Sequence, residues 1–183
     1  MRITISTVLT ISRIAVIPLM VLIYYMPGLE TVNRNLLSGF LFVYASITDG
    51  LDGYIARKWN QVSPLGTMLD PIADKLVVTT ALVILMKAGI ADLIPSLIII
   101  CREILVSGLR EFLANLKGTK LPVTKLAKWK TAIQMVAICC LLFQDGLLTF
   151  DLTVIGEVML YLAAGLTIVT GVDYMYAVLR EME

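Results

Sequence analysis

Residues 48–75 read TDGLDGYIARKWNQVSPLGTMLDPIADK, and they place four aspartates in a chain that is otherwise mostly apolar. Of the 183 residues, 58% are hydrophobic and only 16% are charged, whereas soluble domains are close to half apolar. This composition indicates a membrane protein. The formal net charge of +1 gives no bulk attraction to nucleic acid, so no nucleic-acid partner is expected.

The apolar residues fall into stretches that are long enough to cross a bilayer, for which a helix needs about 20 residues. Residues 2–13, RITISTVLTISR, predict a short amphipathic helix at the membrane interface before the first stretch. We therefore expect one all-α membrane domain over residues 1–183. Its predicted transmembrane helices cover residues 8–26, 35–57, 67–87, 91–115, 128–146 and 152–178.

The distribution of Lys and Arg predicts the orientation, because these residues concentrate on the cytoplasmic side of membrane proteins. With the N-terminus inside, the outer connections hold only Arg34 and Lys87. The inner side then receives Arg2, Arg13, Arg57, Lys58, Lys117, Lys120, Lys125, Lys128, Lys130 and Arg180. Both termini and the 48–75 stretch are expected to face the cytoplasm.

The four aspartates are spaced so that their side chains can converge. Asp49 and Asp52 are three residues apart at the end of one predicted span, and Asp70 and Asp74 are four apart at the start of the next. On helices, each spacing places both members of a pair on one face. A short loop joins the two spans, so both pairs are expected at a similar depth near the inner surface.

Four carboxylates at that depth must protonate, pair with basic residues or bind cations. The chain has no histidine, and hard oxygen ligands favour Mg²⁺ or Mn²⁺ over zinc; two divalent ions would balance four carboxylates. Two-metal carboxylate sites recur where phosphate is attacked. Two alternatives stay open at this point: pairing with Arg57, Lys58 and Lys75, or the ion path of a divalent-cation transporter.

Small residues accompany the first aspartate pair. Gly50, Gly53 and Ala56 form a face to which a backbone or a planar ligand can approach closely, although plain helix packing explains such a face equally well. Arg57, one turn beyond Gly53, is well placed for a phosphate.

The second pair follows a predicted helix start. Ser63 and Pro64 have the residue types of an N-cap and a first helical position. Pro71 lacks an amide donor and is expected to kink the helix beside Asp70.

The string Asp49-x2-Asp52-Gly53-x2-Ala56-Arg57-x8-Gly66-x3-Asp70-x3-Asp74 resembles the signature of the CDP-alcohol phosphotransferase family at every fixed position and every gap. The segments LDPIADK, REILVSGLRE and AKWKT are similar to the bacterial phosphatidylglycerophosphate synthase branch of that family. The resemblance implies a homodimer in the bacterial inner membrane, with six spans, a cytoplasm-facing cavity and two metal ions.

The resemblance also implies roles for the matched residues. Asp49, Asp52, Asp70 and Asp74 would hold the metals, and Asp74 would also act as general base. The pocket for the CDP group of CDP-diacylglycerol would be lined by Gly53, Ala56, Arg57, Ser63, Gly66 and Thr7.

The N-terminal segment departs from the family in part. Relatives often read N-x-P-T-x-x-T-x-x-R, and here Thr4 and Ser6 replace the Asn and Pro, whereas Thr7, Thr10 and Arg13 agree. The departure leaves open what this segment contributes to nucleotide binding.

Basic residues in the fourth and fifth spans are candidates for binding the phosphate of the acceptor. These are Arg102, Arg110, Lys128 and Lys130. Basic groups at membrane depth usually have a partner, so an internal ion-pair network that includes Glu103 and Glu111 is the alternative.

The reaction implied by the resemblance is attack of an acceptor hydroxyl on CDP-diacylglycerol, with CMP leaving. The expected acceptor is sn-glycerol 3-phosphate, which gives phosphatidylglycerol phosphate. Inositol phosphate, serine or another alcohol is the alternative acceptor.

Overall fold

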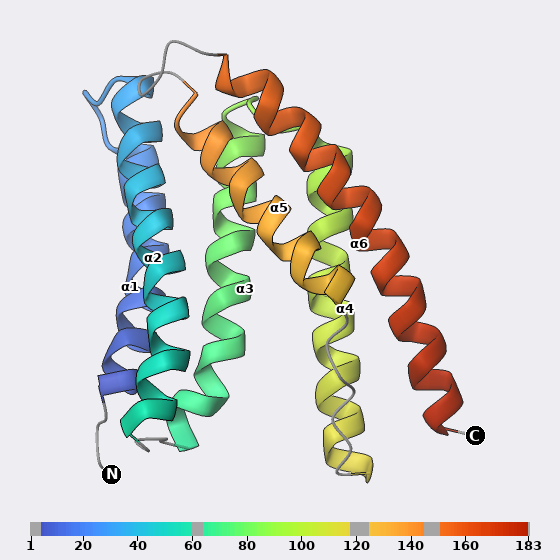
Figure 1. Cartoon of the computed structure of the whole chain (residues 1–183). Helices are drawn as coiled ribbons and strands as arrows, with labels where there is room; N and C mark the ends of the chain where they lie inside the picture. Colours follow the sequence, from blue (N-terminus) through green and yellow to red (C-terminus); the bar gives the residue numbers. More distant parts are fainter. Residues whose placement is uncertain (1–4, 60–63, 118–124, 145–150, 183) are drawn as a thin grey trace. The chain divides into compact units, whose positions relative to one another are not determined.

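The computed structural model describes residues 5–59, 64–117, 125–144 and 151–182. Within these ranges the side chains are described except at 5–6, 52–59, 64–65, 67, 114–117, 125 and 181–182. The described residues form six helices and no strand (Figure 1). The helices are α1 (Ile5–Tyr25), α2 (Thr31–Trp59), α3 (Pro64–Lys87), α4 (Leu93–Lys117), α5 (Lys125–Leu142) and α6 (Leu152–Met182).

The predicted all-α fold is confirmed, and each predicted span has its helix. The largest differences, of four residues each, are at the start of α2 (Thr31 rather than 35), the end of α5 (Leu142 rather than 146) and the end of α6 (Met182 rather than 178). By length and composition, two stretches among the described residues are able to cross a membrane, Thr7–Tyr25 in α1 and Leu152–Arg180 in α6. Six transmembrane helices therefore stay a prediction.

The prediction of a separate interfacial helix over residues 2–13 is wrong for the part that is described. From Ile5 onward these residues are the first turns of α1, which continues without interruption to Tyr25. The polar residues Thr7, Thr10 and Arg13 are buried, at 2%, 0% and 1% exposure. They recur every three positions, so they form one helical face that packs inside the protein instead of facing the interface.

The chain divides into two compact units. The first contains residues 1–88 and 142–149, and the second contains residues 89–141 and 150–183. In the first unit α1 packs against α2 and α3, with Met20, Phe42 and Ala73 completely buried. In the second unit α4 packs against α6 around Ile99 and Ala163.

Two residues explain where α3 begins and ends. Pro64 is its first residue, a position where the missing amide donor of proline costs nothing. Gly89, just beyond Lys87, has a φ of +73°, a left-handed conformation that glycine adopts without strain. Pro71 lies inside the helix, which continues through it. Ser63, the predicted N-cap, lies outside the described residues.

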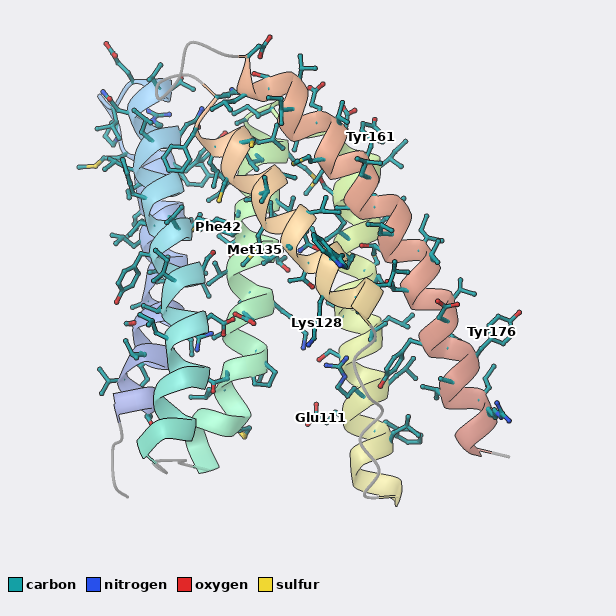
Figure 2. All side chains as sticks on the ribbon, in the orientation of Figure 1. Phe42, Glu111, Lys128, Met135, Tyr161 and Tyr176 are labelled. Carbon is teal, nitrogen blue, oxygen red and sulfur yellow. The ribbon has the colours of Figure 1, made fainter. Side chains whose placement is uncertain are left out.

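Large apolar side chains are exposed on the outer faces of the helices. Leu22 on α1 and Ile94 on α4 are 67% and 71% exposed. On α6, Tyr161 and Tyr176 project outward (Figure 2). Apolar faces of this kind suit lipid better than water.

The packing of α6 predicts a difference between two of its glycines. A Cβ atom on Gly156 would lie 2.7 Å from Cγ of Leu141, which is itself buried, whereas a Cβ on Gly165 would meet nothing within 4 Å. We expect Gly156→Ala to destabilise the protein by about 1–3 kcal/mol, because the packed side chain must move.

The matched control is Gly165→Ala, which is expected to raise stability by up to about 1 kcal/mol through the better helix propensity of alanine. Thermal unfolding of the detergent-solubilised variants measures both changes. Equal stability of the two variants would contradict this description of the packing.

Candidate functional site

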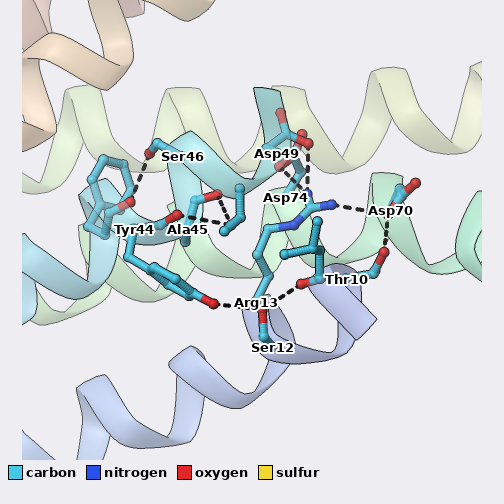
Figure 3. A network of polar contacts seen from close by, with 12 residues as sticks. Thr10, Ser12, Arg13, Tyr44, Ala45, Ser46, Asp49, Asp70 and Asp74 are labelled. Carbon is cyan, nitrogen blue, oxygen red and sulfur yellow. Dashed lines mark hydrogen bonds and ion pairs between the residues drawn. The ribbon is translucent and has the colours of Figure 1, made fainter. Parts of the chain in front are cut away.

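Three of the four aspartates of the 48–75 stretch lie together in the first unit. Asp49 is near the end of α2, and Asp70 and Asp74 are one turn apart near the start of α3. All three accept hydrogen bonds from a single guanidinium, that of Arg13 on α1 (Figure 3). The geometry therefore agrees with the predicted convergence for these three residues.

Arg13 contacts the three aspartates through its two terminal nitrogens. Nη1 lies 2.7 Å from Oδ1 of Asp49 and 3.2 Å from Oδ1 of Asp74. Nη2 lies 3.1 Å from Oδ1 of Asp70. Asp49 lies on α2 and Asp74 on α3, so a single nitrogen of Arg13 bonds to carboxylates from two different helices.

Further hydrogen bonds surround this aspartate cluster, by which we mean Asp49, Asp70 and Asp74. Thr10, one turn before Arg13 on α1, donates its hydroxyl to Oδ1 of Asp70. Ser12, two residues after Thr10 on α1, accepts a bond of 3.1 Å from the hydroxyl of Tyr44 on α2. Helix α1 is thus joined by polar contacts to both of its neighbours.

The charged groups of this cluster differ in their number and in their exposure. The Arg13 side chain is 1% exposed, while those of Asp49, Asp70 and Asp74 are 40%, 34% and 47% exposed. Three carboxylates share one guanidinium, so the negative charge is in excess, and it lies on the more accessible side. Such an arrangement attracts cations.

The donor set fits divalent metal ions in its chemistry, because carboxylate oxygens are the ligands that Mg²⁺ and Mn²⁺ prefer. Three of the four predicted ligands already converge on a cation, the guanidinium. Among the residues that the structure describes, no group of three acidic, cysteine or histidine side chains forms a ready metal site. Instead, Arg13 lies among the carboxylates.

Most residues predicted for the nucleotide pocket lie where no side chain is described. This holds for the predicted metal ligand Asp52 and for Gly53, Ala56, Arg57 and Ser63. Of the remaining two, Gly66 is buried in the first turn of α3, and Thr7 is buried on α1, one turn before Thr10.

A second polar cluster, formed by Arg102, Glu103, Lys130 and Thr170, lies in the second unit. Nη1 of Arg102 is 3.3 Å from Oε1 of Glu103, and Lys130 donates to the same oxygen. Nη2 of Arg102 donates to the hydroxyl of Thr170 at 3.2 Å. Lys130 is 1% exposed, so its ammonium depends on Glu103 for its charge partner.

The other two residues predicted for the acceptor lie elsewhere in this unit. The Arg110 guanidinium lies over the ring of Tyr174, 5.7 Å from its centre, which is a cation–π contact. Lys128 is exposed on the first turn of α5 (Figure 2). Glu103, which was expected to pair with basic groups, does so with Arg102 and Lys130.

Sequence reasoning did not assign Arg13 to the aspartates. Its segment was interpreted as interfacial, and a separation of 36–61 residues hides the contacts. The available signal was the three-residue spacing of Thr7, Thr10 and Arg13, which places three polar groups on one helical face.

Comparison with known proteins supports the resemblance found in the sequence. The family model described as CDP-alcohol phosphatidyltransferase matches residues 3–169. The chain belongs to this family. The match covers all of the first unit's three long helices and most of the second unit.

Individual relatives cover nearly the whole chain. A protein of Rickettsia bellii is 49% identical over 92% of both chains, and one of Wigglesworthia glossinidia brevipalpis is 37% identical over 100% of this chain and 98% of its own. Both carry the name CDP-diacylglycerol--glycerol-3-phosphate 3-phosphatidyltransferase. A rice protein named cardiolipin synthase (CMP-forming) is 39% identical over 97% of this chain, which covers 58% of the rice protein.

The hydrogen bond from Thr10 to Asp70 generates a prediction. Thr10→Val keeps the shape of the side chain and removes the donor, and Asp70 then loses one of its partners inside the protein. We expect a loss of about 1.5–3 kcal/mol in stability, as for other hydrogen bonds to charged groups.

The control is Thr131→Val on α5, an exposed residue whose hydroxyl bonds to the backbone of its own helix. Its stability should stay within about 0.5 kcal/mol of the parent protein. Chemical or thermal unfolding in detergent compares the two, and a Thr10→Val protein as stable as the Thr131→Val protein would contradict the importance of this bond.

Proposed function

We propose that this protein transfers the phosphatidyl group of CDP-diacylglycerol to sn-glycerol 3-phosphate, which yields phosphatidylglycerol phosphate and CMP. The observation that carries the proposal is the name shared by relatives at 37–49% identity over nearly all of the chain. The convergence of Asp49, Asp70 and Asp74 supports the same chemistry, since it gathers acidic groups where a diphosphate and its cations would bind.

In this proposal Asp49, Asp52, Asp70 and Asp74 hold two divalent ions, Mg²⁺ or Mn²⁺. When bound, the ions supply positive charge that neutralises the diphosphate and the leaving CMP. The cluster is open on one side, because its carboxylates are 34–47% exposed, so a phosphate group can approach it.

Asp74 is proposed as the general base. It is the most exposed of the three described carboxylates, at 47%, and its Oδ1 contacts Arg13. Its other oxygen can accept the proton from the acceptor hydroxyl while the first stays bound. The chain has no histidine that could take this role.

Arg102 and Lys130 are the strongest candidates for the acceptor phosphate. They share one carboxylate, Glu103, so this cluster carries an excess of positive charge, and a phosphate would complete it. Arg110 and Lys128 stay secondary candidates, since Arg110 lies on Tyr174 and Lys128 is exposed.

The proposed setting is the bacterial inner membrane. All six helices would cross the bilayer, with both termini and the aspartate cluster at the cytoplasmic side, as the distribution of Lys and Arg predicts. The donor then keeps its acyl chains in lipid and its nucleotide in water. A homodimer and a single domain over residues 1–183 remain part of the proposal.

A second candidate keeps the chemistry and changes the acceptor. The rice relative, named for cardiolipin synthesis and CMP formation, shows that a protein 39% identical to this chain carries the name of another product. Inositol phosphate and serine are further alternatives. A cation transporter finds no support among these relatives, which are named as transferases or synthases.

The proposed function is tested by CMP release from CDP-diacylglycerol with a panel of acceptors. We expect release only when a divalent ion and sn-glycerol 3-phosphate are both present. If glycerol 3-phosphate is inert and phosphatidylglycerol, serine or inositol phosphate reacts, the assigned acceptor is wrong.

The general base is tested by Asp74→Asn. The amide cannot take a proton from the acceptor, so we expect kcat to fall by about 10²–10⁴-fold. The control is Glu157→Gln, which neutralises an exposed carboxylate on α6 and should leave kcat unchanged. Full turnover by the Asp74→Asn protein would remove Asp74 from this role.

The acceptor site is tested by Arg102→Lys. The substitution keeps the charge but loses the planar fork that binds a phosphate through two nitrogens. We expect KM for glycerol 3-phosphate to rise about tenfold, equivalent to about 1.4 kcal/mol, with KM for CDP-diacylglycerol little changed.

Arg180→Lys near the end of α6, where the side chain is exposed, is the matched control and should leave both KM values unchanged. An Arg102→Lys protein that loses affinity for CDP-diacylglycerol instead would place Arg102 on the donor side.

A further inference from the structure

Arg13 lies where three helices meet. Its side chain is 1% exposed, and it bonds to one aspartate of α2 and two of α3. A buried guanidinium is stable only when its charge is matched. Here the positive charge of Arg13 is more than balanced, because three carboxylates face this one guanidinium.

The oxygens that Arg13 uses belong to three of the predicted metal ligands. Oδ1 of Asp49 and Oδ1 of Asp74 both bond to Nη1, and Oδ1 of Asp70 bonds to Nη2. A divalent ion requires oxygens at about 2.0–2.6 Å, and close contact between it and a guanidinium on the same atoms is repulsive. Full occupation of these oxygens by one cation therefore excludes the other.

We propose that Arg13 is a positioning residue that acts as the internal counter-ion of the aspartate cluster and competes with divalent cations for Asp49, Asp70 and Asp74. Either cation holds the carboxylates of α2 and α3 together. Binding of the divalent ion shifts the guanidinium away from the oxygens that it shares. The inference rests on the proposed function insofar as the cluster must bind divalent ions.

Thr10 contributes to the same arrangement. Its hydroxyl donates to the Asp70 oxygen that also faces Arg13, so Asp70 has an uncharged partner from α1 in addition to the guanidinium. When a divalent ion displaces Arg13, this neutral bond can persist and keep Asp70 in position.

The proposal predicts opposite effects of Arg13→Gln on stability and on cation affinity. In chelator, the variant should unfold at a clearly lower temperature than the parent protein, because the carboxylates have lost their counter-ion. In saturating Mg²⁺ most of this loss should be recovered, since the metal replaces the missing charge. The affinity for Mn²⁺, measured by the electron paramagnetic resonance signal of the free ion, should rise at least tenfold.

Two further variants make the test specific. Arg13→Lys keeps the charge, but its single nitrogen cannot replace the two terminal nitrogens with which Arg13 contacts three carboxylates. Its Mn²⁺ affinity should therefore lie between those of the parent protein and Arg13→Gln. Arg34→Gln removes a cation from the same unit that bonds to the backbone of Met26 instead of to the cluster. It should leave both measurements unchanged.

The outcomes separate this inference from the proposed function. If Arg13→Gln binds Mn²⁺ no more tightly than the parent protein, or is destabilised equally with and without Mg²⁺, Arg13 is only a structural residue and the inference is overturned. An Arg13→Lys protein that binds Mn²⁺ as tightly as Arg13→Gln would equally overturn it, because the retained charge would then make no difference. If the parent protein itself binds no Mn²⁺, the proposed metal chemistry fails, and this inference fails with it.

Discussion

The contact between one guanidinium and three carboxylates is the constraint on which the first unit depends. Arg13 is completely enclosed, and the three aspartates that it contacts lie on other helices. When α1 packs against α2 and α3, its guanidinium therefore has to meet the carboxylates, in addition to the contacts between apolar side chains. Removing Arg13 would leave the three carboxylates facing one another without this counter-ion, which destabilises the packing of the three helices.

The second unit contains a related cluster in which the signs of the charges are reversed. There, one carboxylate, Glu103, lies between two cations, and Thr170 accepts a further bond from Arg102. Gly171 allows the Arg102 side chain to lie against α6, since a Cβ at this position would be 3.2 Å from Cγ of Arg102. The aspartate cluster thus contains three carboxylates against one guanidinium, whereas the second polar cluster contains two cations against one carboxylate.

Much of this could be predicted from local sequence, because helices and the spacing of residues on one helical face are local properties. The six helices, the start of α3 at Pro64 and the meeting of Asp49 with Asp70 and Asp74 follow from periodicity, from proline chemistry and from a short connection between α2 and α3. The roles of the aspartates remain proposals, and Asp52 lies beyond the described side chains.

The incorrect predictions have one cause. The residues next to a polar residue in the sequence do not indicate which residue it contacts in the folded protein. Residues 2–13 have the amphipathic pattern of an interfacial helix, whereas Thr10 and Arg13 contact aspartates of other helices that lie far away in the sequence. In the same way, the expected ion-pair network gave no particular partner for Glu103, whose contacts are with Arg102 and with Lys130, which is 27 positions away. Contacts between residues this far apart in the sequence are determined by tertiary packing.

The burial of Arg13 has a consequence for biosynthesis. Ribosomes deliver α1 before its neighbours, and the partners of Arg13 follow 36–61 residues later in the chain. A lone arginine is costly in hydrocarbon, so in the proposed six-span arrangement this part of α1 would stay near the headgroups until α2 and α3 have been synthesised. In that arrangement, the N-terminal end of α1 would reach its final depth only after α3 is in place.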